Sequence, residues 1–263
     1  MQIVRYAEQH LVKRHRGTMP VILTAPHGGS EQPAEVLEPR QSDQTPAGCD
    51  FETERDNETA LITESVAQEI LELTGLSPYV VIANFHRRFI DANRSEPCAF
   101  TDLAARPFYD EYHNRIAEYI SQIRSQNQSH GFLFDIHGTV EIGSDPADIY
   151  LGTKNGSTLP FGFDRRNIFM QHGLHGLLKA ASHQTGAGGG GSVLSYRVSP
   201  GNETAIETTQ VSGGFTVSTY GALINSIQIE IASTIRDVAE TRGVFIEDVA
   251  FAIINFVRRY APF

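Results

Sequence analysis

Residues 20–29 read PVILTAPHGG, an apolar run that ends in a histidine and two glycines. The part 20–25 has the length and the β-branched content of a buried strand. Gly, Pro and Gln are frequent in the polar stretch 28–51, which predicts a long surface loop after this strand. The two glycines allow the backbone to turn sharply beside His27. We therefore expect a strand that carries an imidazole into a polar loop at its carboxyl end.

Along the rest of the chain, short apolar runs alternate with amphipathic stretches, which is typical of α/β architecture. Further strands are predicted at 78–84, 131–136, 147–151, 192–198 and 226–231. Helices are predicted at 57–74, 106–126, 166–185 and 246–259, and a glycine-rich turn at 186–191. No internal repeat or boundary is visible, so we expect one domain that spans residues 1–263.

Composition excludes several classes of function. The chain has 31 acidic and 21 basic residues, a formal charge of −10. Such a field repels phosphate backbones and anionic membranes, so we expect neither a nucleic-acid nor a membrane partner. The N-terminal residues do not resemble a signal peptide, and no segment approaches the roughly 18 apolar residues that span a bilayer. These features predict a cytoplasmic protein.

The chain has two cysteines, Cys49 and Cys98, without Cys-x-x-Cys spacing. This pattern predicts neither a disulfide framework nor a cysteine-rich zinc module. A reducing compartment fits it best.

Polar side chains mark the ends of other predicted strands, where the reactive groups of open α/β sheets gather. Asp135 and His137 are two residues apart in the run GFLFDIHG, so they point to the same side of the pleat. His27 and His137 could share one metal ion, although ordinary hydrogen bonds would also account for each. Glu230 lies in the apolar run SIQIEI, where a carboxylate is costly to bury. A buried ion pair is the alternative to a functional role for it.

Residues 86–94, HRRFIDANR, form a third polar segment after a predicted strand. Arginines in it could clamp a substrate carboxylate, because a planar guanidinium matches two carboxylate oxygens. The alternative is a solvated basic loop in which Asp91 pairs with a neighbouring arginine.

Seven short motifs follow one another between about residues 20 and 235. They are PHGG at 26–29, the helix start at Asp56, HRRFIDANR at 86–94, DIHG at 135–138, LGTKNGS at 151–157, GGFTVSTYG at 213–221 and SIQIEI at 226–231. Together they resemble the N-formylglutamate amidohydrolase family, which is related to the zinc carboxypeptidases and to the aspartoacylase and succinylglutamate desuccinylase group. The resemblance implies a single-domain, phosphorylase/hydrolase-like α/β fold of the zinc carboxypeptidase type, with a mixed central sheet flanked by helices.

The resemblance also implies one catalytic Zn²⁺ ion held by His27, His137 and a carboxylate. Asp56 is the expected third ligand, with Glu31 and Glu58 as the alternatives. A helix N-cap is the competing role for Asp56, because an aspartate before a helical run commonly accepts hydrogen bonds from the first-turn amides. Two imidazoles and one carboxylate leave a zinc position open for water, whose pKa zinc lowers towards about 7.

For the chemistry, the resemblance implies that Glu230 is the general base and that Arg87 stabilises the oxyanion, with Arg88 as the alternative to Arg87. The implied substrate-binding residues are Asn93 and Arg94 for the α-carboxylate, together with Arg88 and Tyr220.

The implied reaction is hydrolysis of the amide bond of a small anionic N-acyl amino acid, and N-formyl-L-glutamate is the first candidate substrate. A zinc carboxypeptidase or a γ-glutamyl or peptide amide hydrolase would use the same metal on another substrate. A non-catalytic module that binds carboxylates through Arg87, Asn93 and Arg94 is the alternative from another class.

Overall fold

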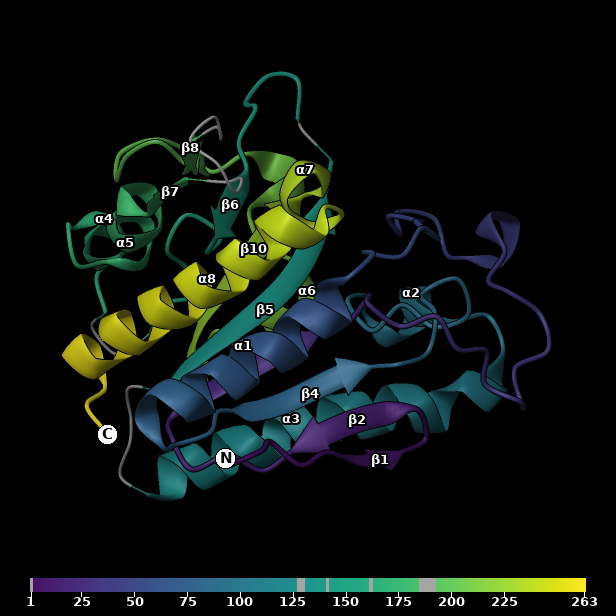
Figure 1. Cartoon of the computed structure of the whole chain (residues 1–263). Helices are drawn as coiled ribbons and strands as arrows, with labels where there is room; N and C mark the ends of the chain where they lie inside the picture. Colours follow the sequence, from purple (N-terminus) through teal and green to yellow (C-terminus); the bar gives the residue numbers. More distant parts are fainter. Residues whose placement is uncertain (1, 127–130, 141, 161–162, 185–192) are drawn as a thin grey trace.

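Eight strands form one mixed sheet at the centre of the molecule (Figure 1). The structure is a computed structural model that describes residues 2–126, 131–140, 142–160, 163–184 and 193–263. The strands of the sheet are β1 (Ala7–Gln9), β2 (Val12–His15), β3 (Val21–Ala25), β4 (Tyr79–Ala83), β5 (Phe132–Thr139), β6 (Ile149–Gly152), β9 (Val198–Ser199) and β10 (Asn225–Ala232). Their order across the sheet is β1-β2-β4-β3-β5-β10-β6-β9.

The central strands β4, β3, β5 and β10 run parallel to one another, and β2 and β6 flank them in antiparallel pairings. The carboxyl ends of four strands therefore meet at one edge, which is where open α/β sheets place their ligands. A separate antiparallel pair is formed by β7 (Ser182–Gln184) and β8 (Val193–Ser195).

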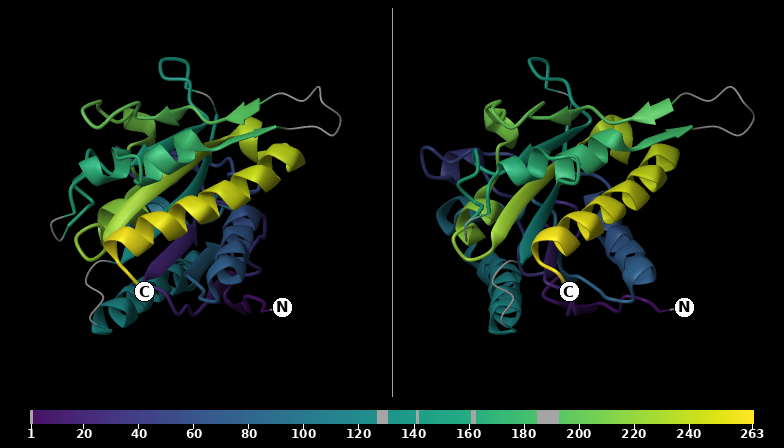
Figure 2. Two further views of the ribbon diagram at one scale, coloured as in Figure 1. Left: turned by 60° about the vertical axis from the view of Figure 1, so that its left-hand side comes forward. Right: turned by 90° about the vertical axis from the view of Figure 1, so that its left-hand side faces the viewer.

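Helices cover both faces of the sheet (Figure 2). The α-helices are α1 (Thr59–Thr74), α2 (Glu96–Ala99), α3 (Arg106–Ser125), α4 (Arg166–Phe169), α5 (Leu174–Ala180), α6 (Phe215–Tyr220), α7 (Ser233–Arg236) and α8 (Ala239–Tyr260), and 3-10 turns lie at Ser42–Gln44, Leu103–Ala105 and Thr209–Val211. One core packs α1, α5 and α8 against the sheet, and the second packs α3 and α6 against the other face.

Strand alternation explains the two cores. In β4, Val80 and Ile82 belong to the core with α1 and α8, whereas Tyr79 and Val81 belong to the core with α3. Successive side chains of a strand point to opposite faces, so an uninterrupted apolar run is what a strand covered on both sides requires. The expected α/β fold with a mixed central sheet is confirmed.

Most of the predicted elements are present within a few residues. The strands predicted at 20–25, 78–84, 131–136, 147–151 and 226–231 are β3, β4, β5, β6 and β10, and the helices at 57–74 and 106–126 are α1 and α3. α1 ends at Gly75, whose φ of 72° is in the left-handed region that glycine adopts without steric cost. The C-terminal helix α8 is longer than predicted, since it begins at Ala239.

Two predictions in the middle of the chain were wrong, and one pair of strands at its start was missed. The helix expected at 166–185 is broken into α4 and α5 at Gly173, and β7 follows them. The strand expected at 192–198 is divided between β8 and β9, which belong to different sheets. The hairpin of the edge strand β1 with β2 was not predicted, because its strands are short and polar and carry no buried alternation. The glycine turn at 186–191 lies outside the described residues.

Cys49 and Cys98 form a disulfide, with their Cα atoms 5.6 Å apart. The interpretation of the two cysteines as thiols of a reducing compartment is therefore wrong for this structure. Sequence spacing could not reveal the pair, because 49 positions separate the two residues and only the fold brings them together. Within the described part of the chain, every helix is too short or too polar to cross a membrane.

Candidate active site

Four predicted site segments converge at the carboxyl edge of the parallel strands. His27 follows β3 by two residues, and the segment with Arg87 follows β4. His137 lies in β5 and is directly opposite Glu230 of β10 in the strand register. Because these strands are parallel neighbours, side chains that are far apart in the sequence reach one cavity.

His27, Asp56 and His137 form a compact buried group. One ligand atom from each lies within 4.8 Å of the other two. The Oδ2 atom of Asp56 is 3.3 Å from Nδ1 of His27 and 3.1 Å from Nδ1 of His137. Two imidazole nitrogens facing one carboxylate are a donor set that suits Zn²⁺ and leaves room for a further ligand. The structure therefore brings together the three residues expected as metal ligands.

The second ring nitrogen of each histidine contacts another carboxylate. Nε2 of His27 is 2.7 Å from Oδ1 of Asp91, and Nε2 of His137 is 2.9 Å from Oδ2 of Asp135. Such partners fix the ring orientation and leave Nδ1 facing the metal position. Burial lowers the pKa of His137, but Asp135 outweighs this effect and raises it well above the ordinary value.

Backbone contacts fix Asp56 beside the histidines. The N–H of Gly138 donates to its Oδ2 over 3.0 Å, and its own N–H donates to the carbonyl of His27 over 3.1 Å. Burial alone would raise the pKa of Asp56, yet the imidazoles of His27 and His137 bring it below its ordinary value. Asp56 is not a helix cap, because the N-cap of α1 is Glu58.

The two alternative ligands lie elsewhere. Glu58 is 3.4 Å from Arg242, and Glu31 is exposed and forms an isolated bridge with Phe85, which follows β4. Neither belongs to the metal-ligand group that the described residues form. Of the three carboxylates considered, only Asp56 fits the site.

Glu230 is buried and lines the cavity, and its Oε1 accepts a hydrogen bond from Nε2 of Gln228 over 2.7 Å. Burial raises the pKa of Glu230 to about 7, and the attraction of His137 offsets part of this rise. A carboxyl group that titrates near neutrality can both take up and release a proton during a reaction. Its position opposite His137 therefore suits the predicted general base.

Arg87 lines the cavity, whereas Arg88 is exposed and covers the ring of Phe89. The guanidinium of Arg87 donates to Oδ2 of Asp91 over 2.8 Å, and its Nη1 is 3.8 Å from Oδ1 of Asp56. Burial lowers the pKa of Arg87, but the charges of Asp91 and Asp56 raise it overall. Of the two arginines, only Arg87 lies beside the group formed by His27, Asp56 and His137.

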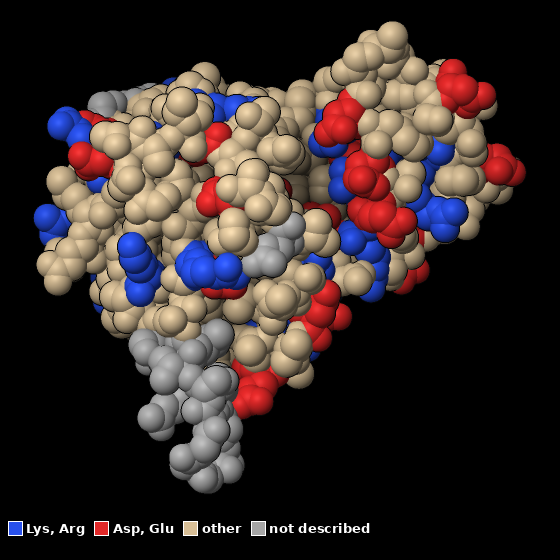
Figure 3. Space-filling view, turned by 90° about the horizontal axis from the view of Figure 1, so that it is seen from above, with Lys and Arg blue, Asp and Glu red and all other residues tan. Residues whose placement is uncertain are grey.

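The cavity has a volume of about 1060 Å³ and opens on the face shown in Figure 3, where acidic and basic side chains gather beside a hollow. Asn93 and Arg94 both line it. Oδ1 of Asn93 accepts the N–H of Thr216 over 2.8 Å. Arg94 donates to the carbonyl and carboxylate of Asp50 over 2.8 and 2.6 Å, and to the carbonyl of Asn93 over 3.0 Å.

Tyr220 does not line this cavity. Its hydroxyl is 3.0 Å from Nδ1 of His113 of α3, and its ring, at the end of α6, is buried in the core that contains α3. From α6, Phe215 and Ser218 face the cavity instead. The expected wall residue is thus replaced by two neighbours from the same motif.

Two functional candidates were missed at the sequence level. Asp91 was considered only as a partner for arginine, and it contacts both Arg87 and His27. Lys154 belongs to the motif LGTKNGS, to which no role was assigned, and it lines the cavity from the loop after β6. No ion pair of Lys154 is found among the described residues. The motif was visible in the sequence, but only the fold shows that it reaches the cavity.

No protein-family model matches the chain, and no curated protein matches it in sequence. Among solved structures, the fold is similar to N-formylglutamate amidohydrolase from Ralstonia eutropha JMP134, with a TM-score of 0.60 and 17% identity over 92% of this chain and 94% of that one. It is also similar to the gene product Atu2144 from Agrobacterium tumefaciens, with a TM-score of 0.57 and 12% identity over 94% and 96% of the two chains. At these identities the likeness shows the fold, and it agrees with the fold that the motifs implied.

Proposed function

We propose that the chain is a zinc-dependent amidohydrolase that cleaves the amide bond of an N-acyl amino acid, with N-formyl-L-glutamate giving formate and glutamate. The observation that carries the proposal is the buried group of His27, Asp56 and His137 facing Glu230 in one open cavity. The shared fold with an N-formylglutamate amidohydrolase supports the choice of substrate.

A zinc ion held by the three ligands would lower the pKa of a water molecule and polarise the amide carbonyl. A carboxylate oxygen of Glu230 would accept a proton from the attacking water and deliver it to the leaving amide nitrogen. Arg87 places its positive charge beside the metal group, where it stabilises the negative charge that develops on the carbonyl oxygen. Asp91 and Asp135 hold the two imidazoles in the orientation that this step needs.

Basic side chains in the cavity wall would bind the carboxylates of the substrate. Three of the five N–H groups of Arg94 are used by Asp50 and Asn93, so two are left for a ligand. The ammonium group of Lys154 on the loop after β6 adds a second cation. We assign the two carboxylates of a glutamate-type substrate to Arg94, with Asn93 beside it, and to Lys154.

The test begins with the zinc content of the purified protein and with formate release from N-formylglutamate. E230Q is expected to keep its zinc and to lose at least about 100-fold in kcat. The matched control is E240Q, which changes an exposed glutamate on α8. A protein without stoichiometric zinc, in which E230Q is as active as wild type, would contradict the proposal. If the protein released free amino acids from peptides and no formate from N-formylglutamate, its activity would be that of a carboxypeptidase.

A further inference from the structure

One wall of the cavity is formed by residues 48–55, which we call the wall segment. Of these residues, Gly48, Cys49, Asp50, Glu52, Glu54 and Arg55 line the cavity. The segment from Cys49 onward has no regular secondary structure, and none of its side chains is buried or belongs to an apolar core. Apart from the half-buried ring of Phe51, which lies 4.9 Å from the guanidinium of Arg40, apolar burial contributes little to hold this wall against the backbone entropy of a flexible chain.

Three arginines donate to alternate carbonyl groups of the wall segment. Arg94 donates to the carbonyl of Asp50 over 2.8 Å, and Arg87 to that of Glu54 over 3.2 Å. Between them, Arg40 donates to the carbonyl of Glu52. These hydrogen bonds hold the segment in place, but each can exchange for a bond to water.

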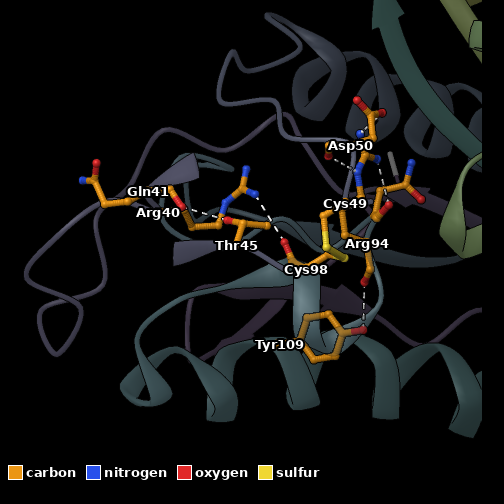
Figure 4. Close-up of a disulfide and its surroundings, with 9 residues drawn as sticks. Arg40, Gln41, Thr45, Cys49, Asp50, Arg94, Cys98 and Tyr109 are labelled. Carbon is orange, nitrogen blue, oxygen red and sulfur yellow. Dashed lines mark hydrogen bonds and ion pairs between the residues drawn. A yellow bond between two sulfur atoms is a disulfide. The ribbon is translucent and has the colours of Figure 1, made fainter. Parts of the chain in front are cut away.

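The disulfide adds a covalent link at the start of the segment (Figure 4). Cys98 lies in α2, and its carbonyl accepts a hydrogen bond from Arg40 over 3.4 Å. The chain just before α2 is itself fixed, because the hydroxyl of Tyr109 on α3 donates to the carbonyl of Arg94 over 2.9 Å. Cys49 is thus tied to a rigid part of the molecule, next to the residue that pairs with Arg94.

We infer that Cys49 and Cys98 are positioning residues of the substrate site, because their disulfide keeps the wall segment, and Asp50 in particular, against Arg94. The inference rests on the proposed function for the identity of the substrate, but not for the state of the wall. Loss of the disulfide frees the end of the segment that is remote from the metal group. Asp56, which follows the segment, keeps its own contacts to Gly138 and His27. Substrate binding should therefore suffer, while zinc binding and the chemical step should not.

The test compares wild type with the double variant C49S/C98S, in which no unpaired thiol is left. A glutamate-specific protease reports on the wall directly, because Glu52 and Glu54 are exposed in it. In the double variant we expect cleavage after these residues to be about tenfold faster and KM for N-formylglutamate to rise about tenfold. The kcat value should stay within about twofold of wild type, and the zinc content should be unchanged.

A phosphine reductant gives an independent arm on the folded wild-type protein. It breaks the S–S bond, takes up the oxygen of a water molecule to become a phosphine oxide, and leaves one proton on each sulfur. Reduction should produce the same two changes in wild type and neither in C49S/C98S, which serves as the control. This arm keeps the test valid if the double variant does not fold.

Wild-type rates of proteolysis and an unchanged KM after loss of the disulfide would overturn the inference. So would a denatured, unreduced wild-type protein that shows two free thiols, because the link would then not exist. If no formate is released from any N-formyl amino acid, the proposed function fails, and the protease measurements still decide whether the disulfide holds the wall.

Discussion

At the scale of single residues, Glu230 shows how burial sets both chemistry and stability. Its pKa of about 7 lies above the ordinary value of 4.5, so the folded protein keeps a proton there that the unfolded chain loses. Stability therefore falls as the pH rises from about 4.5 to about 7. The change corresponds to about 3 kcal/mol, since each unit of pKa is worth about 1.4 kcal/mol.

E230Q cannot ionise at this position and should escape this fall. The difference in unfolding free energy between metal-free E230Q and metal-free wild type should grow by about 3 kcal/mol, in favour of E230Q, as the pH rises from about 4 to about 8. Urea denaturation of both proteins at several pH values measures the difference. A constant difference across this range would show that Glu230 titrates normally in the folded protein.

Lys154 provides a second prediction at this scale. K154Q removes a cavity cation without removing a salt bridge found among the described residues, so it should weaken the binding of an anionic side chain and leave the fold intact. We expect kcat/KM for N-formylglutamate to fall about 10- to 100-fold and that for N-formylglutamine to change little.

The control for Lys154 is K179Q, on the exposed side of α5 and outside this cavity. Equal losses on the glutamate and glutamine substrates would mean that Lys154 does not distinguish a side-chain carboxylate from an amide.

At the scale of elements, the strands that carry the site could be predicted from the sequence, whereas the irregular segments between them could not. β3, β5 and β10 are largely apolar runs, and a polar residue within such a run or directly after it stands out, because burial on both faces leaves few other uses for it. His27, His137 and Glu230 were found in this way. Asp56, in contrast, lies at the end of an irregular segment, and its assignment came from the resemblance.

Contacts between residues far apart in the chain could not be predicted from the sequence. Nothing in the spacing of Cys49 and Cys98 indicates a bond, and nothing local shows that Tyr220 turns towards His113. The edge hairpin of β1 and β2 was missed for a related reason, since a strand with solvent on its outer side needs no apolar pattern.

The spacing of Asp135 and His137 on β5 leads to a prediction about the metal. Asp135 holds Nε2 of His137 and accepts a hydrogen bond from Thr24 over 2.5 Å. In D135N the imidazole loses its anionic partner, so zinc affinity should fall about 10- to 100-fold. Competition with a chelating dye measures the affinity, and the melting temperature of the metal-free variant serves as the control for folding. Unchanged zinc affinity would reduce Asp135 to a purely structural partner.

At the scale of the whole molecule, the net charge of −10 and the proposed anion site are separate features. The lack of a nucleic-acid partner stays a prediction from the net charge, while basic side chains that include Arg87, Arg94 and Lys154 line one cavity. The disulfide bears on the compartment, because such bonds persist in oxidising surroundings and are rare in the cytosol. The cytoplasmic location stays a prediction. Thiol labelling in intact cells would test it, by showing whether Cys49 and Cys98 are free or joined in the disulfide.

Zinc should also link two neighbouring strands to the segment before α1, since its expected ligands come from the loop after β3, from β5 and from that segment. A ligand present at about 100 times its Kd adds about 2.7 kcal/mol to the folded state. For a chain of this size that corresponds to a rise of about 5–10 °C in Tm. Thermal melts of the dialysed protein with and without added zinc measure it, and magnesium is the control because it prefers oxygen ligands.

The gain from zinc should shrink as the pH falls. In the metal-free protein Asp135 raises the pKa of His137 against the opposing effect of burial, so the imidazole holds a proton that zinc must displace. Acidification strengthens this competition, and the difference in Tm should therefore be larger at about pH 8 than at about pH 6. A zinc effect of the same size at both values would mean that the ion binds elsewhere than at the buried histidines.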